Sequence, residues 1–345
     1  MSGCPFIPRG LTAESQAMPR PPYDPKLEAA VAWNMGSPEA FETLEGIRAD
    51  PFSPTLDAIL EKFPDLKHTE YTIPGPADNP NSTVTLSVFV SQTSTSTNRP
   101  VVYNIHGGGQ ISGTRFTGLD AVAGWYTGLD IVIITVEYRL APEHPAPAAL
   151  NDCYAGLAWV GNHAAQLGIH PGKILVQGVS GGGPLAAACA IKARNEKFPP
   201  LRAQLLSTPM LDSRCGSVSS RQFEGMGIWN GRTNRLAWGY VLGKGKVEER
   251  KGGEEEEEKV SELISPSRAS DLAGVAPAFI DVGDAEVFRD EAVAYASLLW
   301  KSGVSTELHV WPACWHAFDM IAPKAPVSQA ATATRRNWVC RQLFD

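Results

Sequence analysis

The sequence predicts an α/β fold in which a mostly parallel sheet of about eight strands is covered by helices on both faces. Three observations lead to this fold class. Short β-rich runs alternate with helical patterns from residue 69 onward. Several runs are apolar almost throughout, which is typical of strands buried on both faces, and the segments between them are long enough for crossover helices. Two glycine clusters, at residues 107–109 and 181–183, closely follow such runs.

The predicted strands belong to a core in two parts, residues 66–211 and residues 266–345. In chain order the strand patterns lie at residues 69–73, 83–90, 100–105, 130–138, 173–179, 202–208, 278–283 and 306–311. Strands that alternate with helical segments in this way favour parallel pairing through crossover connections.

Two segments do not follow this alternation, and we assign them to a helical cap. Residues 1–65 form an N-terminal cap segment, in which residues 25–35 and 54–63 carry apolar side chains at helical spacing. Residues 212–265 form a cap insertion that holds Phe223, Met226, Trp229, Trp238 and Tyr240 before an acidic loop. An alternative interpretation is that these aromatic side chains only pack a surface helix.

The charge balance argues against nucleic acid as a partner. The chain has 30 basic and 37 acidic residues, a formal net charge of −7, and its five consecutive glutamates are residues 254–258. No basic stripe accompanies them, whereas proteins that bind nucleic acid carry one. A block of like charges is typical of a solvated loop.

Targeting and cysteine patterns indicate a cytoplasmic protein without membrane insertion. Residues 1–20 lack the apolar stretch of roughly 7 to 15 residues that a secretory signal needs. The apolar run at residues 131–134 is far too short to cross a bilayer. The six cysteines include no CxxC pair, which favours reduced thiols over disulfides or a zinc site. We predict no metal.

The second glycine cluster contains the clearest chemical motif. Residues 178–182 read G-V-S-G-G and fit G-x-S-x-G, the sharp strand-to-helix turn that exposes a nucleophilic serine, here Ser180. A dinucleotide-binding loop would need glycine where Ser180 stands, and GKGK at residues 243–246 lacks the spacing of a phosphate loop. We therefore predict a nucleophile elbow.

A serine nucleophile needs a histidine base and an acid that orients it. His316 follows the last predicted strand, which suits the chain order serine, acid, histidine. The segment after the strand at residues 278–283 offers four acids, Asp284, Glu286, Asp290 and Glu291. The residues alone leave the choice among these acids open.

From about residue 70 to its end, the chain resembles the hormone-sensitive-lipase group of α/β-hydrolases. The resemblance rests on HGGG at residues 106–109, EYRLAPEHPAPAALND at residues 137–152, the serine turn and the acid segment. The family pattern around its acid ends in Asp-Glu, which matches residues 290–291 and implies Glu286 as the triad acid rather than Asp284. The extra methylene of a glutamate, in place of the usual aspartate, then needs a slightly withdrawn backbone.

The same resemblance implies that the HGGG loop stabilises the oxyanion of acyl transfer. Backbone N–H groups can approach a substrate closely where side chains are absent. The predicted donors are the amides of Gly108, Gly109 and Gly181, and His106 is expected to brace the loop. Val179 and Gln110 depart from the usual family residues at two positions of the acyl site, and with Trp229 we expect them to line the substrate pocket.

These inferences predict a serine carboxylesterase that acts on small to medium, largely apolar esters and needs no cofactor. The same triad could instead pass the acyl group to an alcohol or amine, as in a biosynthetic acyltransferase or lactone-forming enzyme. A third alternative is a non-catalytic small-molecule-binding member of the fold, which the presence of Ser180, Glu286 and His316 disfavours. A homodimer is compatible with the sequence.

Overall fold

The computed structural model describes residues 18–27, 41–49, 52–244 and 260–345. The acidic run at residues 254–258 and most of the expected helix at residues 25–35 lie outside the described residues. The expected helix at residues 54–63 is present as α3 (Leu56–Lys62), which begins at the side-chain cap of Thr55.

The core is an eight-stranded sheet with the spatial order β1-β2-β4-β3-β5-β6-β7-β8. Its strands are β1 (Leu66–Pro74), β2 (Thr83–Ser91), β3 (Arg99–Ile105), β4 (Val132–Glu137), β5 (Ile169–Val179), β6 (Leu201–Ser207), β7 (Ala278–Gly283) and β8 (Thr306–Trp311). β2 pairs antiparallel with β1 and β4, and the other neighbours are parallel. Each strand overlaps one of the predicted runs, so the predicted fold class is confirmed.

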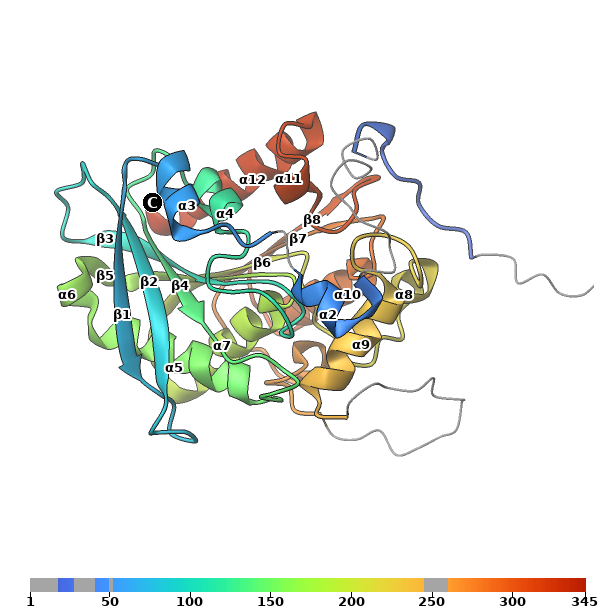
Figure 1. The fold of residues 1–345 in the computed structure, drawn as a ribbon, viewed down its shortest axis with the longest axis horizontal. Coiled ribbons are helices and arrows are strands. Elements are labelled where there is room, and N and C mark those ends of the chain that lie inside the picture. The colour runs from blue at the N-terminus through green and yellow to red at the C-terminus, as the bar shows by residue number, and fades with distance from the viewer. Residues whose placement is uncertain (1–17, 28–40, 50–51, 245–259) are drawn as a thin grey trace, which may run out of the picture.

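Helices cover both faces of this sheet (Figure 1). One face packs against α5 (Ala148–Asn162), α7 (Gly182–Glu196) and α10 (Arg289–Lys301), and the other against α3, α4 (Leu119–Trp125) and α12 (Pro326–Leu343). Along β5, Val176 joins the first apolar cluster and Leu175 the second. Alternate side chains of a strand point to opposite faces, which explains why these strands are apolar throughout.

The remaining helices are shorter or lie near the ends of the strands. They are α2 (Leu44–Arg48), α6 (Ala164–Leu167), α8 (Val218–Gln222), α9 (Gly231–Val241), α11 (Phe318–Ile321) and a 3₁₀ turn, η2 (Pro266–Arg268). In Figure 1, α2, α8 and α9 lie on the same side of the molecule. The start of α9 contacts the described residues just before α2, because the hydroxyl of Thr233 donates to the carbonyl oxygen of Phe41 at 2.9 Å.

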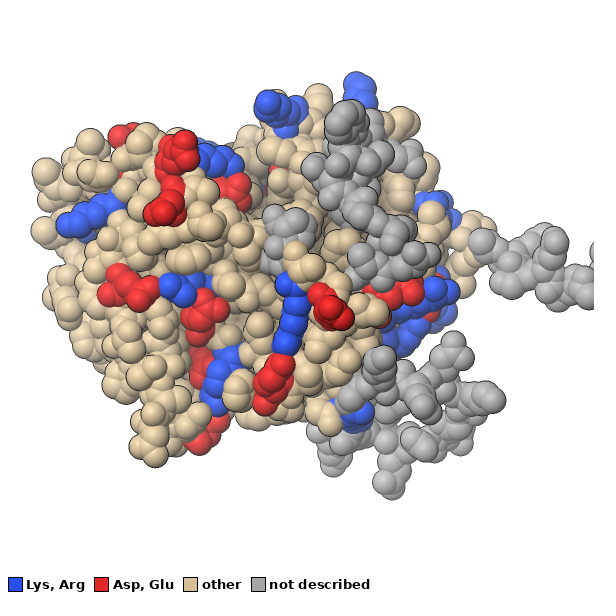
Figure 2. All heavy atoms as spheres, in the orientation of Figure 1, with Lys and Arg blue, Asp and Glu red and all other residues tan. Residues whose placement is uncertain are grey.

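The surface carries both signs of charge. On the face shown in Figure 2, basic and acidic side chains are interspersed, and several form ion pairs, such as Arg48 with Glu143 at 2.6 Å. Among the described helices, none combines the length and apolar character needed to span a membrane.

Candidate active site

Ser180 lies on the sharp turn between β5 and α7. Its φ of 53° is in the left-handed region, a conformation that costs a non-glycine residue about 1–3 kcal/mol. Space requires the flanking glycines, because a Cβ at Gly178 would lie 2.2 Å from the carbonyl oxygen of Gly182. A Cβ at Gly182 would in turn lie 2.2 Å from the carbonyl oxygen of Ile105. The G-x-S-x-G pattern thus forms the tight turn that it predicts.

Three buried side chains from different loops form a hydrogen-bonded chain. The Oγ atom of Ser180 lies 2.9 Å from Nε2 of His316, and Nδ1 of His316 lies 2.6 Å from Oε2 of Glu286. A carboxylate can only accept a hydrogen bond, so Nδ1 carries the proton and Nε2 accepts from the serine hydroxyl. This is the tautomer that allows His316 to take a proton from Ser180.

The two acids considered from the sequence have different partners. Glu286 contacts His316 and also accepts a hydrogen bond from the N–H of Gly283 at 3.2 Å. Asp284 accepts instead from the N–H of Ala313 at 2.7 Å, and burial raises its pKa. Glu286 is therefore the acid beside the imidazole, whereas Asp284 holds the loop that leads to it.

The HGGG loop packs directly against the serine turn. A Cβ at Gly181 would lie 2.5 Å from the backbone nitrogen of Gly109, and one at Gly107 would lie 3.3 Å from Cβ of Ser180. Gly108 and Gly109 have φ values of 92° and 61°. The amides of Gly108, Gly109 and Gly181 lie in turns. Among the described residues, none of the three donates a turn, loop or cap hydrogen bond to a backbone carbonyl. Three N–H groups beside the serine are thus available to a ligand.

His106 supports this loop as a neutral residue. Its ring stacks on Tyr138 with centroids 4.1 Å apart, and the Tyr138 hydroxyl donates to the carbonyl oxygen of His106 at 2.9 Å. Burial lowers the pKa of His106 to about 4, although its contact with the carbonyl oxygen of Gly107 partly opposes the shift. A neutral, stacked imidazole is suited to bracing the loop rather than to carrying charge.

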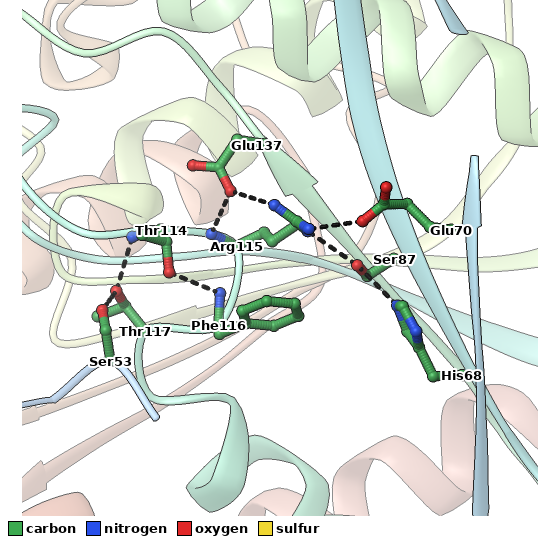
Figure 3. Close-up of polar contacts among 9 residues, drawn as sticks. All are labelled: Ser53, His68, Glu70, Ser87, Thr114, Arg115, Phe116, Thr117 and Glu137. Carbon is green, nitrogen blue, oxygen red and sulfur yellow. Dashed lines mark hydrogen bonds and ion pairs between the residues drawn. The ribbon is translucent and has the colours of Figure 1, made fainter. Parts of the chain in front are cut away.

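The loop that continues from the HGGG segment is attached to three strands through Arg115 (Figure 3). The guanidinium donates to Glu70 on β1 at 2.6 Å, to Ser87 on β2 at 2.9 Å and to Glu137 on β4 at 2.9 Å. Thr117, two residues further on, lines the cavity beside Ser180. These contacts therefore fix one wall of the cavity relative to β1, β2 and β4, the three strands at one edge of the sheet.

An apolar cavity of about 300 Å³ opens in front of Ser180 and His316. Of the pocket residues predicted from the sequence, Val179 and Trp229 line it, whereas Gln110 is buried but does not. The remaining wall consists of Phe41, Ile47, Phe52, Pro54, Gly107, Gly108, Ser112, Thr117, Gly118, Asp120, Ala121, Ile228, Ala317, Met320 and Ile321.

Sequence reasoning missed most of this wall. Phe41, Ile47 and Phe52 come from the N-terminal segment, and Met320 follows His316 on α11. Only their apolar character and position near the motifs could have indicated them. Among the described residues, no group of three or more His, Cys, Asp or Glu side chains is arranged to hold a metal ion.

Comparison with known proteins identifies the class. A family described as having the α/β-hydrolase fold matches residues 101–320. The chain therefore belongs to this hormone-sensitive-lipase-like family of α/β-hydrolases, as its motifs indicate.

Individual relatives are named as esterases. The carboxylesterase NlhH of Mycobacterium tuberculosis is 36% identical over 237 residues, which cover 68% of this chain and 71% of the relative. Esterase LipI of the same species is 31% identical over 251 residues, covering 68% and 70%. Among solved structures, a bacterial heroin esterase superposes with a TM-score of 0.81 at 34% identity, covering 93% of this chain and 98% of its own.

Proposed function

We propose that this chain hydrolyses carboxylic esters through a covalent acyl intermediate on Ser180. The observation that carries the proposal is the hydrogen-bonded chain from Glu286 through His316 to Ser180. Relatives named as carboxylesterases and esterases support this activity rather than acyl transfer to another acceptor or non-catalytic binding. The chain is accordingly a serine hydrolase, and its substrates are small-molecule esters.

In the first half of the reaction, Ser180 is acylated. The Nε2 atom of His316 accepts the hydroxyl proton while Oγ attacks the ester carbonyl carbon. Glu286 stabilises the imidazolium that forms, and the imidazolium then gives its proton to the departing alkoxide, which leaves as an alcohol. The C–O bond to the alcohol breaks, and the acyl group remains on Oγ.

In the second half, water releases the acid. His316 takes a proton from water, the resulting nucleophile attacks the acyl carbon, and the same proton returns to Oγ of Ser180 as the carboxylic acid leaves. Both halves pass through a tetrahedral oxyanion. The amides of Gly108, Gly109 and Gly181 would donate to it, and each such donor is worth about 2.7–4 kcal/mol in other hydrolases.

The cavity supports small to medium, largely apolar esters as substrates. We propose that residues 1–65 and 212–265 act as two parts of a cap, because Phe41 and Ile47 from the first and Ile228 and Trp229 from the second line the same cavity. A volume of about 300 Å³ is at the lower end of ligand pockets. It suits short acyl chains better than long ones.

The direct test is turnover of p-nitrophenyl acetate and butyrate by wild type and Ser180→Ala. We expect the variant to lose at least about 10⁴-fold in kcat. Equal rates for the two proteins would contradict the nucleophile assignment. A paired comparison tests the acid: Glu286→Ala should lose about 10³–10⁴-fold, whereas Asp284→Ala, with the same change in charge, should lose far less.

Two further proposals come from the sequence. We propose a cytoplasmic location, which cell fractionation tests, and a homodimer, which the molar mass measured by light scattering on a sizing column tests. A monomer at micromolar concentration would contradict the second proposal.

A further inference from the structure

Arg335 is a fully buried cation on α12, only 1% exposed. Its guanidinium donates to Asp281 at 2.6 Å, to Asp319 at 2.9 Å and to the hydroxyl of Ser207 at 3.2 Å. The guanidinium carbon lies 3.9 Å from the centre of the Trp125 ring. The two carboxylates are as buried as the arginine.

Each acceptor belongs to a segment that carries one member of the triad or is hydrogen-bonded to it. Ser207 ends β6, and its carbonyl oxygen accepts the N–H of Ser180 at 2.9 Å. Asp281 lies on β7, two residues before Gly283, whose N–H binds Glu286. Asp319 lies on α11, three residues after His316.

Stability alone does not account for such a cluster. A buried ion group is often no more stabilising than well-packed apolar side chains of similar volume, because desolvation offsets the attraction. Burial raises the pKa of Asp281, although Arg335 opposes that shift. What the cluster adds is geometry, since a planar guanidinium fixes several acceptors at set directions.

We propose that Arg335 is a positioning residue of the active site, which sets the segments of Ser180, Glu286 and His316 relative to one another. This inference rests on the proposed esterase function. It predicts that losing the guanidinium misaligns the triad in molecules that remain folded. A mutation far from the reacting atoms that misplaces a catalytic group by about 1 Å can cost about 100-fold in rate.

The test compares Arg335→Met, Arg335→Lys and a matched control, Arg336→Met. Arg336 is the next residue on the same helix and donates to the carbonyl oxygens of Trp125 and Thr127 at 3.0 and 2.8 Å. Its loss weakens the attachment of α12 without touching a segment of the triad. Thermal unfolding is recorded for all variants, and kcat is expressed per site titrated with a fluorophosphonate.

We expect Arg335→Met to lower kcat by roughly 100-fold with KM within about threefold, and Arg335→Lys to recover part of the loss. Arg336→Met should keep kcat within about twofold whatever its loss of stability. Equal kcat values for Arg335→Met and wild type would overturn the proposal, and so would an equal kcat loss in the control.

If Arg335→Met does not fold, Asp319→Asn removes one arm of the cluster. We then expect a kcat loss of roughly tenfold and a shift of the downfield NMR signal of the His316 Nδ1 proton. An unchanged kcat and an unchanged signal would overturn the proposal. Failure of the esterase function itself looks different, because the wild-type protein would then neither turn over esters nor be labelled at Ser180.

Discussion

Replacing Gly109 with alanine tests whether the HGGG loop supplies an oxyanion donor. An added Cβ would lie 2.4 Å from Cη2 and 2.6 Å from Cζ2 of Trp229. Both distances are far below van der Waals contact, so either the loop or the indole must move. In addition, φ at Gly109 is 61°, where a Cβ costs roughly 1–2 kcal/mol.

The expected effect on activity follows from the donor that is displaced. Loss of one preorganised amide raises the barrier by about 2.7–4 kcal/mol, which is about 10²–10³-fold in kcat. The measurement is kcat for p-nitrophenyl butyrate per titrated site, with stability from urea unfolding. Gly124→Ala on α4 is the control, because its nearest neighbour would be Cζ of Phe63 at 3.9 Å. That change should keep kcat and add about 0.5–1 kcal/mol of stability.

A double variant separates the clash from the backbone strain. If the indole ring drives the loop away, Trp229→Ala should restore at least about tenfold of the kcat lost in Gly109→Ala, a coupling that residues in contact commonly show. Trp229→Ala alone should mainly raise KM, because it widens the cavity. The reasoning is refuted if Gly109→Ala retains kcat within about threefold of wild type, since its amide would then not be a donor in the transition state.

Three further predictions follow from other parts of the structure. His106 has a folded-state pKa of about 4, below its ordinary value of 6.5, so its contribution to stability is complete above pH 6.5 and is lost as the pH falls toward 4. The free energy of unfolding should decrease over that window by up to about 3 kcal/mol, and His106→Phe should lack this component in urea titrations at each pH. Met320→Ala should raise the ratio of kcat/KM for octanoate over butyrate esters by about tenfold, because it removes a wall of the cavity. Gly118→Ala should lower the same ratio, since its Cβ would lie 2.3 Å from Cε of Met320; equal ratios in both variants would contradict this placement of the acyl chain. Lys197 caps the C-terminal end of α7 with φ at 54°, in the left-handed region that favours glycine. Lys197→Gly should therefore stabilise the protein by about 0.5–1 kcal/mol without changing kcat. A lower unfolding midpoint would contradict this prediction.

The sheet could be predicted from the sequence because each strand carries its own signal. Val176 and Leu175 are adjacent and both apolar, which already requires two covered faces. Gly178 is similarly local, since a Cβ there would meet the carbonyl oxygen of Gly182 within the tight turn itself. Local rules of this kind need no knowledge of the rest of the fold.

The cavity wall and the buried arginine could not be predicted in this way. Phe41 and Met320 reach one cavity from segments almost 280 residues apart, and nothing in either segment encodes the other. Arg335 reads as an ordinary helix residue until β6, β7 and α11 supply its acceptors. Gln110 shows the converse: its position after the HGGG loop suggested a pocket residue, but its side chain is not part of the wall.

Backbone strain is concentrated where the proposed chemistry takes place. Among the described residues, seven non-glycine residues have a positive φ, and five of them adjoin the site: Gln110, Ser180, Thr208, Ala313 and Ala317. Ala313 and Ala317 lie within three residues of His316 on either side. Thr208 follows Ser207, whose carbonyl oxygen accepts the N–H of Ser180. Such conformations persist only where the surroundings over-determine them. Here the buried strands adjoin these turns, so the rigidity of the sheet and the proposed reactivity of Ser180 depend on the same packing.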